Sequence, residues 1–474
     1  MPFVLYLLAL AVFAQGTSEF MLAGLIPDIA TDLGVSVPAA GALTSAFAVG
    51  MIVGAPSMAV LSLRWPRRRA LLTFLITFMA VHVLAAVTTS FPVLVGTRIV
   101  GALANAGFLA VALAAATSMV GPNAKGRATS ILIGGVTLAC VAGVPAGAVL
   151  GSLWGWRSAF WAVALICIPA ILAIARAIPA SPNPDPTTTS SATTGDMSPG
   201  PASSGPTTAD AATPCATTSG PASSGAGSFG VTTSDAATGG RMTSGPAASG
   251  PGVSGATTSA AESVVGGVGG RGLREVRVLG RSRVLVALLS AALLNGATFC
   301  TFTYLAPLVT EVTGLPAGWV PVVLALFGVG SFLGVTLSGR LADTRPGPLL
   351  LIGSALLLAG WVVFALTAGN AVVTLVFLLV QGTLSFAVGS TLIAQVLYAA
   401  ADAPTLGGGF ATAALNVGAA IGPWLGGVTI EAGLGYRSPL WVSAALVAVA
   451  LAIVVVTRRP RLGHFVGISF RRRR

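Results

Sequence analysis

The sequence has 474 residues, of which 54% are hydrophobic and only 8% are charged, and its mean hydropathy is +0.90. This composition excludes a soluble globular domain and is typical of a polytopic membrane protein. The net charge of +12 comes mainly from arginines that flank apolar runs, so we interpret it as a topology signal and not as a nucleic-acid-binding surface.

Twelve apolar runs of membrane-spanning length follow in chain order. The first set covers residues 3–26, 38–62, 70–88, 92–119, 128–151 and 157–178. The second set covers residues 284–310, 318–340, 347–367, 371–400, 405–430 and 437–457. Arginines and lysine follow the second, fourth, eighth and twelfth runs, whereas acidic residues predominate in the loops on the other side. By the positive-inside rule, both termini and the segment between the sets are expected in the cytoplasm.

The two sets are copies of one another, because a shift of 280 residues aligns them from end to end. The aligned pairs include Pro27 with Pro307, Gly34 with Gly314, Phe47 with Phe327, Gly147 with Gly427, and GWRS at 155–158 with GYRS at 435–438. Two parallel six-helix halves with a binding site between them, near the middle of the membrane, form the architecture of a rocking transporter. The predicted fold is therefore an all-α integral membrane protein of twelve transmembrane helices in two six-helix pseudo-repeats.

The predicted organisation has two helical halves, a linker and a tail. The N-terminal half is 1–178, the linker 179–282, the C-terminal half 283–458 and a basic cytoplasmic tail 459–474. The linker is rich in Ser, Thr, Gly and Pro and ends in a basic segment. Such a composition cannot bury enough apolar surface to offset the entropy of ordering, so the linker is expected to be disordered.

The first apolar run carries a single charge, Glu19. An ionisable group at membrane depth is costly, so it is expected to line a polar cavity, to pair with a partner, or to carry protons. Arg98 in the fourth run is the predicted partner, because both residues lie about 7 to 9 Å to the same side of their helix centres at 1.5 Å per residue. The pair is predicted to couple transport to protons; a static structural pair is the alternative.

Helical phase predicts which side chains line the central cavity. The predicted cavity residues are Gln15, Asn105, Phe108, Asn295, Thr298, Phe302, Gln381 and Ser385. A few polar groups among aromatic rings suit an uncharged, amphipathic, aromatic cargo. His82 is interpreted as a polar residue at the membrane interface and not as a proton carrier.

The fifth run contains a glycine ladder. Gly143, Gly147 and Gly151 recur at four-residue spacing, which allows another helix backbone to approach closely. Pro145 lies within the ladder and is expected to bend the helix, because it removes a backbone hydrogen bond. The alternative to a role in coupling is simple close packing.

Several of these strings resemble the major facilitator superfamily, in particular its twelve-helix drug–proton antiporters. They are GTSEFMLAGLIPDIATDLGVS at 16–36, TSAFAVGMIVGAP at 44–56, AGVPAGAVLGSLWGWRSAFW at 142–161 and SGRLADTRPG at 338–347. The branch they look like contains actinobacterial chloramphenicol-resistance exporters. This resemblance implies a proton-coupled antiporter that exports small drugs by alternating access, with chloramphenicol as the expected cargo.

The resemblance also assigns roles to individual residues. Arg98 matches the arginine of the family's helix 4 motif, and the glycine ladder with Pro145 matches its antiporter motif. Arg340, Asp343 and Arg345 match the gating motif after the eighth helix. Leu63 occupies the position that corresponds to Asp343 in the first half, so a charge latch is not expected there.

Two other functions remain open from the sequence. One is export of sugars or of an endogenous metabolite by the same fold, and the other is a transport-inactive scaffold that uses the linker. Two histidines and four scattered cysteines form no ligand or catalytic cluster, so no enzyme activity, metal site or cofactor is predicted. The proton gradient is the expected energy source. The expected partners are a small-molecule drug, protons and lipid but no nucleic acid, for a monomer in the bacterial cell membrane.

Overall fold

The computed structural model describes residues 3–62, 65–120, 124–177, 282–341, 346–399 and 404–458. Within these ranges it contains twelve helices long and apolar enough to cross a membrane, in agreement with the predicted spans. The linker, whose disorder the sequence predicts, lies outside the described residues. The basic tail and the gating residues Asp343 and Arg345 lie outside them too.

The N-terminal half begins with α1 (Phe3–Phe20), the 3-10 turn η1 (Met21–Gly24), α2 (Ile26–Leu33), α3 (Val37–Ser62), α4 (Arg67–Val87) and α5 (Phe91–Ser118). It continues with α6 (Lys125–Leu138), the π-helical turn η3 (Ala139–Gly143), α7 (Val144–Trp154) and α8 (Arg157–Ala177). The fifth membrane span is therefore α6, η3 and α7 in succession.

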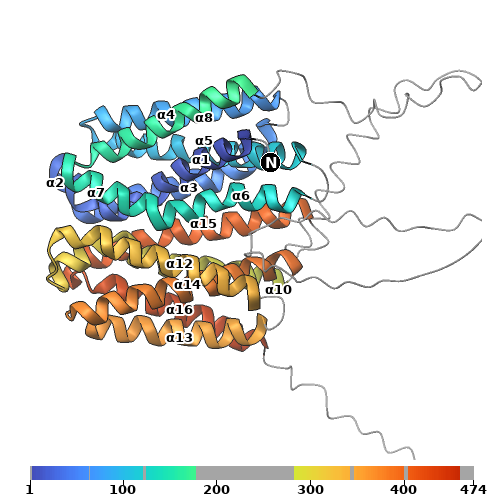
Figure 1. Ribbon diagram of the computed structural model, residues 1–474. Coiled ribbons are helices and arrows are strands. Elements are labelled where there is room, and N and C mark those ends of the chain that lie inside the picture. The colour runs from blue at the N-terminus through green and yellow to red at the C-terminus, as the bar shows by residue number, and fades with distance from the viewer. Residues whose placement is uncertain are drawn as a thin grey trace, which may run out of the picture.

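The C-terminal half begins with α10 (Ser282–Thr303), α11 (Leu305–Pro307), the π turn η5 (Leu308–Val312), the 3-10 turn η6 (Ala317–Trp319) and α12 (Val320–Leu341). It continues with α13 (Pro346–Thr367), α14 (Ala371–Ala399), α15 (Pro404–Thr429), the π turn η7 (Ile430–Leu434) and α16 (Ser438–Arg458). Figure 1 shows the two halves stacked side by side, with α15 and α12 of the second half against the first.

The backbone conserves the repeat that the sequence predicts. Gly34 and Gly314 have φ of 63° and 73°, and Gly155 and Gly435 have φ of 81° and 71°. The backbone of a residue with a Cβ atom is strained at these positive φ values, so the positions favour glycine. The same two turns therefore recur in each half at the same spacing.

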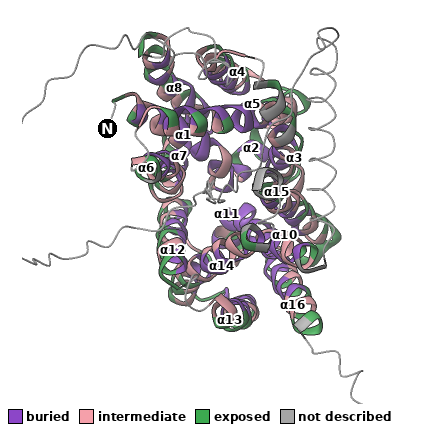
Figure 2. Ribbon diagram, turned by 90° about the vertical axis from the view of Figure 1, so that its right-hand side faces the viewer, coloured by how far each residue is buried: buried purple, intermediate pink, exposed green. Residues whose placement is uncertain are grey.

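The two ends of the bundle are distinct. The start of α1, the end of α8, the start of α10 and the end of α16 lie at one end, which we call the linker end (Figure 1). The opposite end, which we call the loop end, carries α2 and the turns at Gly34, Gly155, Gly314 and Gly435. Figure 2 views the bundle from the linker end and shows the helices of each half gathered into a separate group.

Glycines bring the first and fifth spans of the N-terminal half into backbone contact. A Cβ atom on Gly143 would collide with the Thr17 hydroxyl, and one on Gly147 would lie 3.3 Å from the Met21 Cβ atom. The ladder thus packs against the first span of its own half, in keeping with close approach. In the C-terminal half, the glycines of α15 approach α10 in the same way.

The bend predicted at Pro145 is found one turn earlier as the π turn η3. Proline has no N–H for the i−4 carbonyl, and a π turn redistributes the backbone hydrogen bonds around such a break. Cys140 of η3 and Val144, the first residue of α7, line a pocket together with residues of the other half.

We predict that Gly143→Ala destabilises the protein by about 1–3 kcal/mol, because the added methyl group overpacks the contact with Thr17. The matched control is Gly134→Ala on the same span, where a Cβ atom would meet nothing within 4 Å. Alanine is the better helix former, so the control is expected to be at least as stable as the native chain. Thermal unfolding in detergent measures both, and equal melting of the two variants would contradict this account of the ladder.

Candidate functional site

A pocket lined mainly by aromatic rings lies between the two halves. Its wall consists of Phe20, Cys140 and Val144 from the N-terminal half, and Thr298, Phe299, Phe302, Phe327, Ser331 and Phe386 from the C-terminal half. Its cavity volume is about 20 Å³, room for about one water molecule, so the rings nearly close the pocket in this conformation. The rings contact one another, with centroids 5.7 Å apart for Phe20 and Phe299 and 4.9 Å apart for Phe302 and Phe327.

Few polar groups face this pocket, and most of these are already engaged. The Thr298 hydroxyl donates to the Leu294 carbonyl at 3.0 Å, and the Ser331 hydroxyl donates to the Gly328 carbonyl at 2.7 Å. Each hydroxyl oxygen can still accept a hydrogen bond. The pocket therefore offers ring faces and edges with a small number of acceptors, which fits an uncharged aromatic molecule.

Glu19 lies beside the pocket, directly before Phe20 in the chain. Its side chain is partly exposed, and it interacts electrostatically with Arg98 and with the pocket residue Cys140. An acidic group in a membrane-spanning helix next to a pocket is a functional-site candidate.

The predicted salt bridge between Glu19 and Arg98 is not closed. Asp32 with Arg157 is the ion pair within 4.0 Å that the described part of the chain contains. Arg98 instead donates from Nη1 to the Ser18 hydroxyl at 2.9 Å and from Nη2 to the Ser18 carbonyl at 3.0 Å. Ser18 and Glu19 are neighbours in the chain, so the depth prediction brought the arginine to the right level but to the adjacent residue.

A buried chain of hydrogen bonds holds Arg98 in this position. The Ser18 hydroxyl lies 2.6 Å from His82 Nε2, and His82 Nδ1 lies 2.7 Å from the Phe78 carbonyl. The Arg98 guanidinium also lies 4.5 Å from the centroid of the Phe47 ring, a cation–π contact. His82 is 3% exposed and lies buried between helices.

The predicted cavity residues divide into two groups. Thr298 and Phe302 lie on the pocket wall, whereas Gln15, Asn105, Phe108, Asn295, Gln381 and Ser385 do not. Asn105 donates to Met51 Sδ at 3.7 Å, and Phe108 is buried in the core of the N-terminal half. The amides of Asn105, Asn295 and Gln381 bond instead to a neighbouring helix of their own half.

The remaining predicted polar residues serve the interior of the bundle. The Asn295 amide donates to the Leu415 carbonyl at 2.7 Å, and the Gln381 amide donates to the Leu357 carbonyl at 3.2 Å. Gln15 and Ser385 are buried, and their polar side-chain atoms have no hydrogen-bond partner among the described residues.

Sequence reasoning missed most of the pocket wall. The residues not predicted are Phe20, Cys140, Val144, Phe327, Ser331 and Phe386. One signal was available, because Phe327 is aligned with Phe47 in the repeat. Of the predicted gating residues, Arg340 is exposed in the last turn of α12 at the linker end.

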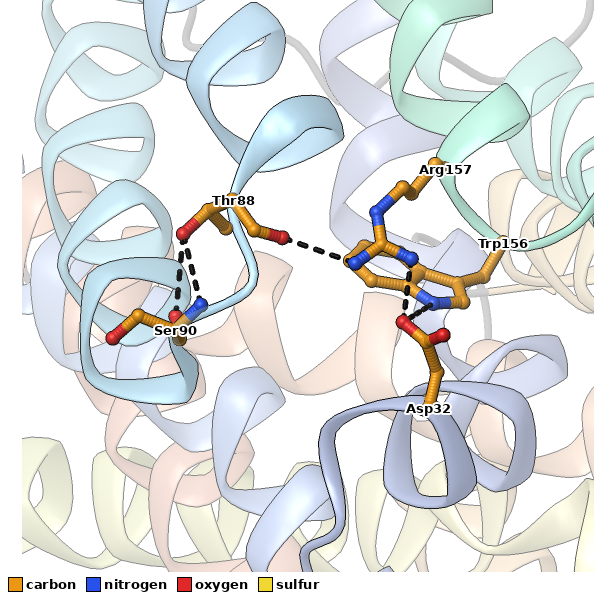
Figure 3. Close-up of polar contacts among 5 residues, drawn as sticks. All are labelled: Asp32, Thr88, Ser90, Trp156 and Arg157. Atoms are coloured by element: carbon orange, nitrogen blue, oxygen red, sulfur yellow. Dashed lines mark hydrogen bonds and ion pairs between the residues drawn. The ribbon is translucent and has the colours of Figure 1, made fainter.

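A second polar cluster lies at the loop end of the N-terminal half (Figure 3). Arg157 donates to Asp32 Oδ2 at 2.5 Å and to the Thr88 carbonyl at 3.1 Å, and Trp156 Nε1 donates to the same Asp32 oxygen at 3.2 Å. The Arg157 guanidinium also lies 4.4 Å from the centroid of the Trp156 ring. This Asp32 cluster ties together α2, the turn before α5 and the turn before α8.

The hydrogen bond from Arg157 holds the pKa of Asp32 below its usual value, with a further contribution from Trp156. In the repeat, Val312 stands where the N-terminal half has Asp32, although Arg437 is aligned with Arg157. The cluster is therefore a feature of the N-terminal half, where it braces the loop end away from the pocket.

The twelve helices, their repeat and the pocket between the halves define a membrane transporter built from two six-helix halves. The family model of the Major Facilitator Superfamily matches residues 8–408, and the chain belongs to this superfamily. This assigns the chain to membrane transport and not to enzymatic catalysis.

Similar proteins cover almost the whole chain. It is 47% identical over 467 residues to a chloramphenicol resistance protein of Streptomyces lividans, covering 97% of this chain and 99% of that one. It is 29% identical over 456 residues to the inner membrane transport protein YdhP of Escherichia coli (strain K12), covering 96% and 95% of the two chains. A solved structure of a bacterial homologue of the human lysosomal transporter Spinster, inward-facing and unoccupied, has a TM-score of 0.63 at 16% identity, covering 96% and 95%.

We predict a small, pH-dependent coupling between Asp32 and Arg157. Their side chains are 45% and 31% exposed, so a double-mutant cycle with Asp32→Asn and Arg157→Gln is expected to give about 1 kcal/mol or less. Because the Asp32 pKa is lowered on folding, this stabilisation is present above about pH 4 and is lost as the pH falls further. Thermal unfolding at about pH 7 and about pH 3 measures it; a coupling that grows in acid would contradict the assignment.

Proposed function

We propose that this chain is a proton-coupled antiporter that exports small amphipathic drugs, with chloramphenicol as its cargo, by alternating access. The similarity over nearly the full length to a chloramphenicol resistance protein supports the choice of cargo. The observation that carries the proposal is the aromatic pocket between the halves, with Glu19 beside it.

The pocket favours a drug over a sugar. Sugar sites use several amides and carboxylates beside a stacking ring, because each hydroxyl taken from water needs a partner. This wall has five phenylalanines and two hydroxyl-bearing side chains. The polar residues that a sugar would have used, such as Asn295 and Gln381, bond to backbone carbonyls inside their own half.

Glu19 is the proposed proton carrier and Arg98 its electrostatic partner. Burying a carboxylate in a membrane-spanning helix costs much more free energy when it is charged than when it is protonated. Its protonation is therefore linked to the side of the membrane toward which the carboxylate is open. No cofactor is required in this scheme, because the proton gradient supplies the energy. One proton exchanged for an uncharged drug moves one charge inward, worth about 2.3 kcal/mol per 100 mV.

Contacts between the halves at the loop end are consistent with an exporter closed at that end. The Tyr304 ring is inserted beside Gly41 of α3, and its hydroxyl donates to the Pro423 carbonyl at 2.9 Å. Ser36 lies 3.4 Å from the Glu431 carboxylate across the same boundary. In the proposed cycle these contacts open while the linker end closes, with 1–178 and 283–458 moving as two bodies.

The proposed setting is the bacterial cell membrane, with the linker end in the cytoplasm. This orientation rests on the arginines at the linker end, by the positive-inside rule. A monomer contains the complete pocket, because both halves that line it belong to one chain.

We predict that Glu19→Gln abolishes proton-driven export and leaves the protein folded, because the amide has nearly the same shape but does not bind and release a proton at physiological pH. The matched control is Glu311→Gln on the exposed loop end. Chloramphenicol resistance of a sensitive bacterium measures export, and quantitative detection in membranes controls for expression. Undiminished resistance in Glu19→Gln at native protein levels would refute the assignment.

We predict that Phe302→Leu weakens transport of chloramphenicol several-fold. The variant keeps an apolar side chain on the pocket wall but loses the ring that the proposed aromatic cargo would contact, worth about 1 kcal/mol, or about fivefold in affinity. Phe332→Leu on the exposed face of α12 is the control. The drug concentration giving half-maximal transport in vesicles is the measurement. An unchanged value for Phe302→Leu, with the native chain active, would place the cargo elsewhere.

A further inference from the structure

Ser18 and His82 have no role in the transport scheme above, yet they form the most deeply buried polar chain of the N-terminal half. Ser18 is fully buried, His82 is 3% exposed and Arg98 is 2% exposed. The three residues come from α1, α4 and α5, so the chain joins three membrane spans. Burying polar groups of this kind costs free energy unless they form hydrogen bonds, and here the distances identify their hydrogen-bond partners.

The direction of each hydrogen bond can be derived. The Phe78 carbonyl can only accept, so His82 Nδ1 carries a proton and donates. Arg98 can only donate, so the Ser18 oxygen accepts from it. In the neutral imidazole, Nε2 then accepts from the Ser18 hydroxyl. A doubly protonated imidazole would place a second positive charge on the serine that already receives the arginine, which like-charge repulsion disfavours.

This arrangement leaves the Arg98 guanidinium incompletely satisfied. Its Nη1 and Nη2 atoms bind Ser18, whereas Nε has no hydrogen-bond partner among the described residues. A carboxylate is the partner that a guanidinium binds best, and Glu19 is the next residue along the same helix. The Arg98 guanidinium thus lies one residue along α1 from a carboxylate with which it interacts electrostatically.

We propose that Ser18 and His82 are positioning residues that hold Arg98 away from Glu19 while Glu19 carries its proton. When the proton leaves, Arg98 turns from Ser18 to the charged carboxylate; when the proton returns, Arg98 turns back. His82 accepts a hydrogen bond from the Ser18 hydroxyl. This bond orients the serine lone pairs toward the guanidinium. This inference rests on the proposed proton coupling and specifies how Glu19 is released from its partner.

The groups that could affect this exchange are few. Within the described part of the chain, Arg98 on α5 and Cys140 on η3 interact electrostatically with Glu19. Arg98 is the charged group that interacts with His82 on α4. The Phe47 ring of α3 lies 4.5 Å from the Arg98 guanidinium in the observed position and carries no charge.

The test is the pH profile of exchange in vesicles containing the full chain, with chloramphenicol as the probe. Ser18→Ala removes the hydroxyl that competes for Arg98, so the arginine spends more time at the charged carboxylate and protons bind only at lower pH. The pH of half-maximal exchange is expected to fall by about one unit, the size of one lost hydrogen bond to a charged group. His82→Phe is expected to shift it in the same direction by less.

Two variants separate positioning from mere stabilisation. His82→Gln keeps a side-chain carbonyl that can accept from Ser18, so it is expected to retain the native profile. Ser443→Ala removes an equally buried helix serine of the other half and is expected to leave the profile unchanged. If Ser18→Ala does not fold, as judged by gel filtration, the comparison of His82→Phe with His82→Gln decides the question.

Each outcome has a defined meaning. A native chain that exchanges no protons for chloramphenicol would overturn the proposed function itself. Active exchange with unshifted profiles for folded Ser18→Ala and His82→Phe would overturn only the positioning role. A uniform loss of rate at every pH, without a shift, would also overturn it, because that is the signature of a structural defect.

Discussion

The close packing of the first span against the fifth is the constraint on which the rest of this protein depends. Gly143, Gly147 and Gly151 face Thr17, Met21 and Leu25 in turn, so the two helices are fixed in register by backbone contact. In lipid there is no hydrophobic force between helices, and such close van der Waals contact stabilises their association instead. The register sets the depth of Glu19 relative to Cys140, and thus places an acid beside the pocket wall.

The two charges in this interior, Glu19 and Arg98, interact electrostatically but are not closed into a salt bridge. Arg98 is buried with two hydrogen bonds to Ser18 and a ring face at Phe47, whereas Glu19 lies at the partly exposed side of its helix. A closed buried ion pair is hard to open, since removing one partner strands the other. In the proposed proton-coupled cycle, an open pair leaves the Glu19 carboxylate free to take up a proton.

The two halves share a backbone but divide the chemistry between them. At the repeat spacing, Glu19 corresponds to Phe299 and Arg98 to Leu378, while Phe47 and Phe327 are aligned. The N-terminal half therefore holds the titratable groups, and the C-terminal half supplies most of the aromatic wall. In the proposed function, a pocket between the halves places the cargo beside Glu19, because the pocket takes one wall from each half.

The sequence by itself determined the class, the twelve spans and the repeat, because hydrophobic length, arginine placement and a constant offset are properties of the chain alone. It also placed Glu19 and Arg98 at one depth, since rise per residue is fixed in a helix. Only the tertiary structure decided that Arg98 binds Ser18, that His82 lies behind it, and that Asn295 and Gln381 turn away from the pocket. The physical reason is rotational: a helix that is apolar on every side carries no mark of which face meets which neighbour, and packing against other helices settles it.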